Sequence, residues 1–85
     1  MTEKETRILR RGIPREEYLE YFKSAGGDET EPGHFVGPGW EVIVGEEKGV
    51  KILGQIMRES EILFRGEEEV IGKLLSQFRI KFMRA

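Results

Sequence analysis

The sequence predicts one two-layer α+β domain in which a curved antiparallel sheet packs against a long C-terminal helix. Short apolar stretches that alternate with polar residues lie between glycine-containing turns in the middle of the chain. An amphipathic segment with helical spacing ends the chain. The 85 residues, 38% of them hydrophobic, suffice for a single domain over 1–85, with residues 1–4 expected to fray.

The N-terminal third is expected to hold a strand and then a short helix. The strand covers residues 5–11, and Gly12 ends it. The spacing predicts a helix over 14–25, because Pro14 suits the first helical position and Gly26-Gly27 can adopt the left-handed conformation that ends a helix. The apolar stripe of this helix consists of Tyr18, Leu19 and Phe22.

Four short strands are expected between the two helices. An acidic, glycine-rich connector over 26–39 contains the short apolar pair Phe35-Val36. The patterns then predict strands at 40–44, 50–57 and 61–65, separated by a hairpin loop at 45–49 and a turn at 58–60. Gly54, inside the second of these, indicates a bulge or a close approach by another element. The predicted order is β-α-β-β-β-β-α.

The last segment is expected to be one helix from Glu67 to about Arg84. Its apolar stripe consists of Ile71, Leu74, Leu75, Phe78 and Phe82. Acids at its start and bases in its later turns suit the helix dipole, while Ile80 falls on the opposite face. An alternative ends the helix at Gln77 and makes Arg79–Met83 a final strand, but no Gly, Pro or Asn separates the two halves.

Composition and charge argue against several classes of function. Without cysteine there is no disulfide, thiolate nucleophile or zinc–thiolate site. A net charge of −2 and a pI of about 5.5 are unlike the dominant basic face of nucleic-acid-binding proteins. No apolar stretch approaches the ~20 residues of a membrane span, and the N-terminus has no signal-peptide pattern. We expect a cytoplasmic protein that binds neither nucleic acid nor a membrane.

No residue pattern predicts a catalytic, metal or cofactor site. His34 is the only histidine and is expected to face solvent from a loop. The acids of Glu67–Glu69 occupy successive helical positions, which point in different directions and cannot converge on one cation. Four arginines near the N-terminus could clamp an anion, but five acids share their region, so a salt-bridged surface is the favoured interpretation. These arginines are Arg7, Arg10, Arg11 and Arg15.

The apolar faces leave two alternatives open. A curved sheet that grips a helix can enclose an apolar pocket for a small ligand. The candidate pocket or interface residues are Trp40, Ile52, Phe64, Phe78 and Phe82. The other alternative is a small enzyme whose site forms across a homodimer, with strand 60–65 or the first strand presenting an edge for pairing.

Several short motifs, read in order, resemble the C-terminal domain of MoaD-related proteins. They are Pro14, Tyr18-Leu19-Glu20, Gly26-Gly27, Gly33-His34-Phe35, Trp40-Glu41-Val42, Arg58, Ile62 and Phe64-Arg65-Gly66-Glu67-Glu68. The resemblance runs from about Thr6 to the last helix and implies a TATA-binding-protein-like fold. It also implies association with molybdopterin or tungstopterin cofactor synthesis or with sulfur-carrier systems.

The leading hypothesis is therefore a non-catalytic accessory or protein-binding module. The resemblance implies that its partner is a sulfur-carrier or molybdopterin-synthesis protein. Two departures from sulfur carriers stand out: this chain has no ubiquitin-like segment, and Gly26-Gly27 is internal whereas the chain ends Phe82-Met83-Arg84-Ala85. We therefore expect that this chain does not itself carry sulfur.

Overall fold

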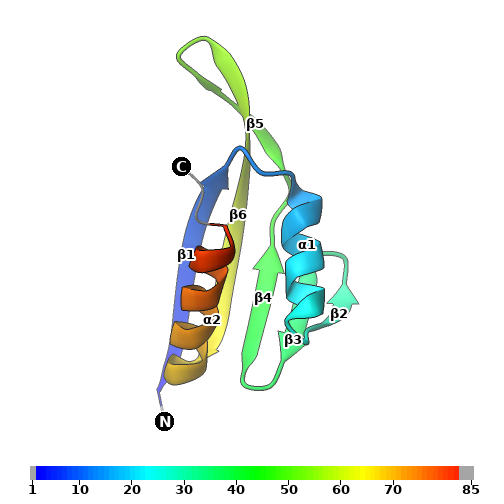
Figure 1. Cartoon of the computed structure of the whole chain (residues 1–85), viewed down its shortest axis with the longest axis vertical. Helices are drawn as coiled ribbons and strands as arrows, with labels where there is room; N and C mark the ends of the chain where they lie inside the picture. Colours follow the sequence, from blue (N-terminus) through cyan, green and yellow to red (C-terminus); the bar gives the residue numbers. More distant parts are fainter. Residues whose placement is uncertain (1, 83–85) are drawn as a thin grey trace.

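One long strand, β6 (Gln55–Glu67), organises the sheet. It pairs antiparallel with β1 (Glu3–Arg11) along one edge. On its other edge it pairs first with β5 (Lys48–Ile52) and then with β4 (Trp40–Val44). The sheet continues to β3 (His34–Gly37) and β2 (Asp28–Glu31), so the order is β1-β6-β4-β3-β2 with β5 attached to β6. This computed structural model describes residues 2–82 (Figure 1).

Two helices lie on one face of the sheet, α1 (Arg15–Ser24) and α2 (Glu68–Lys81) (Figure 1). Gly26, with a φ of 97°, turns the chain out of α1, and the N–H of Gly27 donates to the carbonyl of Phe22. α2 follows β6 without a loop. The acids of its first turn and the bases of its last turn are aligned with the helix dipole, as the sequence predicts.

The core forms where the alternating apolar residues of β4 and β6 meet the stripes of the two helices. Trp40, Val42 and Val44 face the helices from β4, with Ile62 and Phe64 beside them on β6. The helices contribute Tyr18, Phe22, Ile71, Leu74, Leu75 and Phe78. The rings of Phe22 and Phe78 stack, and Phe64 meets Phe78 edge-on with ring centroids 5.5 Å apart. The predicted α+β class and the helix packed on an antiparallel sheet are therefore confirmed.

The predicted number of strands between the helices is wrong: there are five and not four. The connector expected over 26–39 contains two paired strands, in which Asp28 lies opposite Val36 and Glu29 opposite Phe35. Every residue of β2 is polar and exposed, because this strand lies at the edge of the sheet. The sequence of an edge strand of this kind lacks the alternation of apolar and polar residues from which a strand is predicted.

The strand predicted at 50–57 is instead a hairpin, and the turn predicted at 58–60 lies inside β6. The chain reverses at Leu53-Gly54, where both residues have positive φ, as a tight two-residue turn demands. At the C-terminus the helix runs on through Lys81, so the alternative strand beginning at Arg79 is wrong. Met83 and Arg84, expected in the helix, lie outside the described residues.

Candidate functional site

The hairpin of residues 48–58, here called the arm, projects beyond the rest of the described chain, here called the body (Figure 1). Pairing with β1 stops where Arg11 meets Glu59, and pairing with β4 stops at Ile62. Beyond those points β6 has only β5 beside it. The molecule is consequently elongated, with extents of 45 × 23 × 19 Å.

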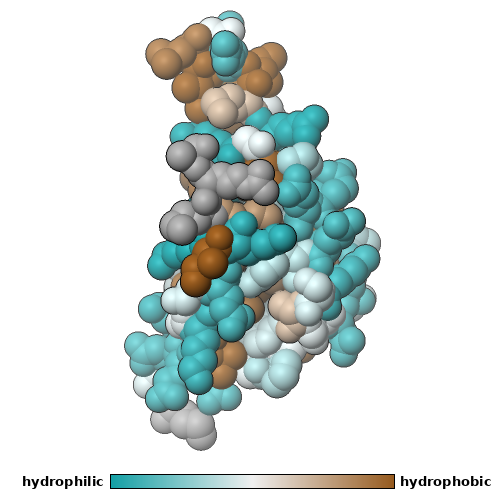
Figure 2. All heavy atoms as spheres, viewed as in Figure 1, coloured by the Kyte–Doolittle hydropathy of each residue, from teal (hydrophilic) through white to brown (hydrophobic). Residues whose placement is uncertain are grey.

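Apolar side chains cover the arm. Leu53 at the tip is 98% exposed and Ile56 is 78% exposed, while Val50, Ile52 and Met57 are partly buried. Figure 2 shows the resulting hydrophobic cap at the end of the molecule. Single exposed apolar residues are common, whereas a contiguous exposed group at a projecting tip is typical of interaction surfaces.

The backbone at the tip reinforces this interpretation. Leu53 has a φ of 51° and is the one residue other than glycine with a positive φ in the part of the chain that the structure describes. Asn, Asp and Gly adopt this conformation more easily than Leu does. At the tip, therefore, Leu53 has a backbone conformation that is unfavourable for Leu. Its apolar side chain is also exposed to water, which is unfavourable too.

The arm is also basic. It contains Lys48, Lys51 and Arg58 and no acid, a charge of +3, whereas the rest of the sequence has 11 bases (14 − 3) and 16 acids, a charge of −5. Arg58 lies 3.7 Å from Glu47, but within residues 2–82 neither lysine forms an ion pair. An apolar, positively charged projection thus extends from an acidic body.

The sheet face opposite the helices carries a ladder of ion pairs. Arg7 pairs with Glu61 at 3.2 Å and Arg11 with Glu59 at 2.8 Å, so the predicted salt-bridged surface is confirmed for these two arginines. Arg65 bridges Glu5 and Glu41 in the same way. Arginines and carboxylates thus lie side by side on this face, as the salt-bridged interpretation predicts.

The other two arginines and the histidine are held by neighbouring groups. The Arg15 guanidinium donates to the carbonyl oxygens of Val44 and Gly45. The predicted solvent-facing loop position of His34 is wrong, because it lies in β3, partly buried, with Nε2 against Glu41. The prediction fails because His34 lies in the connector over 26–39, where the sequence pattern does not predict the two paired strands.

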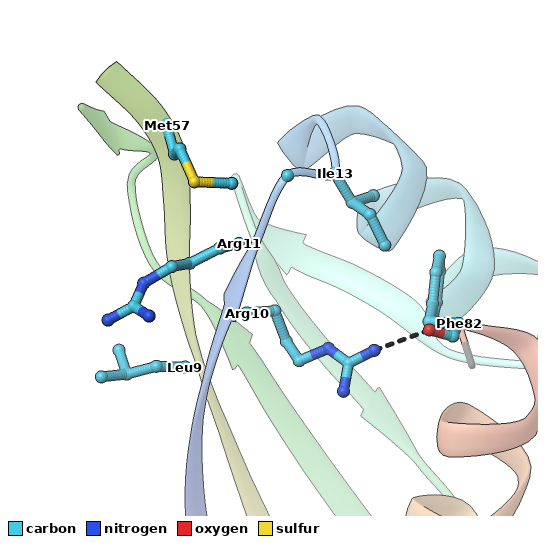
Figure 3. A pocket seen from close by; sticks show the side chains of 7 residues that line it. Leu9, Arg10, Arg11, Ile13, Met57 and Phe82 are labelled. Carbon is cyan, nitrogen blue, oxygen red and sulfur yellow. Dashed lines mark hydrogen bonds between the residues drawn. The ribbon is translucent and has the colours of Figure 1, made fainter. Parts of the chain in front are cut away.

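Arg10 points to the helix side of the sheet, into a hollow of about 680 Å³ where β1 ends (Figure 3). Its Nη2 donates to the carbonyl oxygen of Phe82 at 2.7 Å, and its guanidinium lies 5.8 Å from the centre of the Phe78 ring. Figure 3 shows Leu9 and Arg11 pointing the opposite way. Arg10 therefore satisfies a carbonyl at the end of α2, where a cation also suits the helix dipole.

Two buried hydroxyls lie near Arg10. Ser60 is its cross-strand partner, and neither Ser60 Oγ nor the Tyr18 hydroxyl has a hydrogen-bond partner within residues 2–82. Burial raises the pKa of Tyr18, and the nearby positive charge of Arg10 opposes that rise. The Tyr18 ring packs against Phe82 with centroids 5.0 Å apart.

The structure brings together four of the five predicted pocket residues and leaves one apart. Trp40, Phe64, Phe78 and Phe82 are buried together in the core. Ile52 lies in the arm. Sequence reasoning missed Leu53 and Ile56 as surface residues, because an apolar run without a standard turn signal is typical of a buried strand.

Within residues 2–82, no group of His, Asp and Glu side chains is arranged to hold a metal ion. No helix in this part of the chain combines the length and apolarity needed to cross a membrane.

Comparison with known proteins gives one family. A family model described as archaeal MoaD-like protein matches residues 6–85. No curated protein matches the chain. The match covers nearly the whole sequence and includes the arm.

Proposed function

Because the chain belongs to the archaeal MoaD-like family, we propose that it is a non-catalytic protein-binding module in sulfur-carrier or molybdopterin-related chemistry. Family membership supports the setting. The arm supports the mode of action, since its tip groups two strongly exposed apolar side chains at the end of a projection. The exposed apolar tip of Leu53 and Ile56 is the single observation that carries the proposal.

The energy available at the arm fits a protein contact. Complete burial of a Leu or Ile side chain contributes roughly 1.5–3 kcal/mol, so Leu53 and Ile56 together supply about 3–6 kcal/mol before the costs of association. A two-stranded hairpin is only marginally stable alone in water. A partner that covers the tip would therefore both bind and order it.

The polar side chains support a binding role over a catalytic one. Arg7, Arg11 and Arg65 are held in ion pairs, and Arg15 is held by backbone carbonyls. A catalytic group needs an unengaged reactive atom beside a substrate site, with a partner that tunes its pKa. These groups instead stabilise the sheet and its connections.

The internal diglycine has a structural role that supports the same proposal. Gly26 ends α1 with its positive φ. A Cβ atom on Gly27 would lie 2.7 Å from Cη2 of Trp40, so the glycine lets the indole ring pack against the backbone. Gly26-Gly27 is thus explained by packing, without a role in carrying sulfur.

Affinity capture from the native host tests the proposed function. The bait is the full chain in three forms: wild type, the arm variant Leu53→Ser/Ile56→Ser, and Ile80→Ser as control. Ile80 is also an exposed apolar residue, 70% accessible, but lies on α2. Wild type and control should recover a sulfur-carrier or molybdopterin-synthesis protein, and the arm variant should lose it. Recovery of no such protein, or equal recovery by all three baits, would contradict the proposal.

A further inference from the structure

We propose that the arm binds a second copy of this chain, in a two-fold dimer in which each arm tip lies on the body of the other copy. The proposal rests on the proposed function in one respect, that the arm is a protein-contact surface. The receiving surface is the part of the open sheet face around Leu9, here called the Leu9 surface.

The exposed area of the molecule is larger than that of a compact monomer. The chain exposes 5884 Å² for a mass of 9.8 kDa. The scaling of accessible surface with mass predicts about 5200 Å² for such a monomer, so roughly 700 Å² is in excess. A standard interface buries about 800 Å² on each partner. This excess comes from the elongated shape, and it shows that the projection leaves surface exposed that a compact monomer would bury.

Charge favours two arms that run in opposite directions over two arms that run in the same direction. Parallel side-by-side pairing would bring +3 against +3 without counter-charges. In the antiparallel arrangement each Lys51 lies near Glu46 at the base of the other arm. The remainder of the chain carries −5, and Lys48 and Lys51 have no ion-pair partner within residues 2–82. The arm of one copy is thus complementary to the body of the other.

The Leu9 surface has matching chemistry. Leu9 is 57% exposed and lies opposite Glu61 in the β1–β6 pairing. A hollow of about 120 Å³ there is lined by Leu9, Gly45, Glu46, Lys48, Glu59 and Glu61. Glu59 and Glu61 already bind Arg11 and Arg7, while within residues 2–82 Glu46 has no ion pair. An incoming apolar tip would meet Leu9, and its Lys51 would meet Glu46.

The geometry closes at two copies. The Leu9 surface lies at the base of the arm, so the tip of the same arm is about five residues away, or roughly 17 Å at strand rise. Two arms crossing in opposite directions therefore bring each tip to the base of the other. The contact is the same in both directions, so it forms a closed dimer and not an open filament.

Sedimentation equilibrium of the full chain at 10–200 µM, in low and high salt, tests the proposal. Wild type and Ile80→Ser should sediment as dimers of twice 9.8 kDa, with a dissociation constant that rises with salt. The arm variant Leu53→Ser/Ile56→Ser should be monomeric with an unchanged circular dichroism spectrum. A monomeric wild type at 200 µM would overturn the proposal.

A charge exchange tests the Leu9 surface itself. Lys51→Glu and Glu46→Lys should each weaken the dimer by about tenfold, because a two-fold contact counts every change twice. The double variant Lys51→Glu/Glu46→Lys should recover to within about threefold of wild type. A double variant weaker than both single variants would exclude this surface as the receiving site.

Two further outcomes separate this proposal from its rivals. A monomer that binds vesicles of phosphatidylglycerol through Leu53 and Ile56 would assign the arm to a lipid surface and overturn the dimer. A monomer that still captures a molybdopterin-synthesis protein through its arm would overturn the dimer and leave the proposed function standing. A dimer whose capture experiment recovers no such protein would support the dimer and overturn the proposed function.

Discussion

Leu53 combines a left-handed backbone with an almost fully exposed apolar side chain. Each property alone costs free energy in an isolated chain, and an Asn at this position would relieve both. The presence of Leu is therefore explained by what it contacts and not by the stability of the hairpin. Stability given up at a binding surface is common in natural proteins.

Leu53→Asn should separate the two effects. We expect the free energy of unfolding of the dilute monomer to rise by up to about 1 kcal/mol, because Asn tolerates positive φ. The same change should weaken the dimer. Urea denaturation at low micromolar concentration measures the first effect and sedimentation the second. Leu53→Ser is the control, since it loses the apolar contact without gaining the turn preference; equal stability of the two variants would contradict the explanation.

Tyr18→Phe should be tolerated despite complete burial. The hydroxyl has no hydrogen-bond partner within residues 2–82, although the Arg10 guanidinium lies near it, so its removal should change the free energy of unfolding at pH 7 by no more than about 1 kcal/mol. Burial raises the pKa of Tyr18 above its ordinary value of 10.0, so the stability tied to the neutral phenol is lost as pH rises past that value. The advantage of Phe should therefore grow at pH 11. A loss above about 1 kcal/mol at pH 7 would show that the hydroxyl is bonded.

Glu29 gives the structure an acid-sensitive contact. Its carboxylate accepts a hydrogen bond from the N–H of Gly33 at 3.0 Å, which, with Lys23 at 3.5 Å, lowers its pKa below the ordinary 4.5. The stabilisation is therefore present above pH 4.5 and disappears as pH falls through the lowered value. Glu29→Gln should be less stable than wild type at pH 7 and equal to it at low pH. Urea denaturation at several pH values measures this, with Glu31→Gln in the same strand as the matched control.

At the scale of the element, Phe78 is the residue of the α2 stripe that contacts the most aromatic rings. Phe78 is fully buried, and its ring lies next to those of Tyr18, Tyr21, Phe22, Phe64 and Phe82. Phe78→Ala should lower the free energy of unfolding by about 3–5 kcal/mol through the cavity it leaves. Ile80→Ala, on the same helix but exposed, should change it by less than about 0.5 kcal/mol. Chemical denaturation compares the two.

The elements differ in how far they can be predicted from sequence. Both helices are predictable because an apolar stripe, flanking glycines and the order of charges agree with one another. β2 is not predictable, because all four of its residues are polar and exposed. The polar residues 58–60 suggest a turn, but Glu59 is matched by Arg11 across the strands, so they remain in β6. Whether β2 and residues 58–60 form strands is decided by the strands with which they pair.

The candidate site was less predictable than the fold. A pocket hypothesis assumes that apolar residues lie inside, and that is correct for Trp40, Phe64, Phe78 and Phe82. Ile52 follows the same pattern and yet lies in the arm. Burial of apolar residues is only a tendency. The local sequence of a hairpin does not show whether it extends beyond the neighbouring strands and helices that would bury its apolar residues.

At the scale of the molecule, the chain consists of a packed body and an arm that lacks a core. The radius of gyration of 13.1 Å exceeds the roughly 12 Å typical of a globular domain of this length, in keeping with the projection. Body and arm should therefore differ in local stability. Opening of the arm exposes no buried core residue, whereas opening of the body does.

Amide hydrogen exchange should display this difference. In the monomeric arm variant we expect amides in β5 and at 55–58 to exchange far faster than those at 62–65, which lie between β1 and β4. In wild type, arm protection should rise with protein concentration as the dimer forms. Arm protection that is independent of concentration would mean that the hairpin is stable by itself.

β6 also bears on the order in which the chain folds. Its pairing with β5 closes a two-residue turn, whereas its pairing with β1 joins residues 48 (59 − 11) to 64 (67 − 3) positions apart. Short loops close at a lower entropic cost than long ones, so the hairpin should form early and β1 should dock last. An early hairpin would align the rest of β6 before its long-range partners arrive. The segment that offers a surface to a second copy would then also be the segment from which the sheet begins to grow.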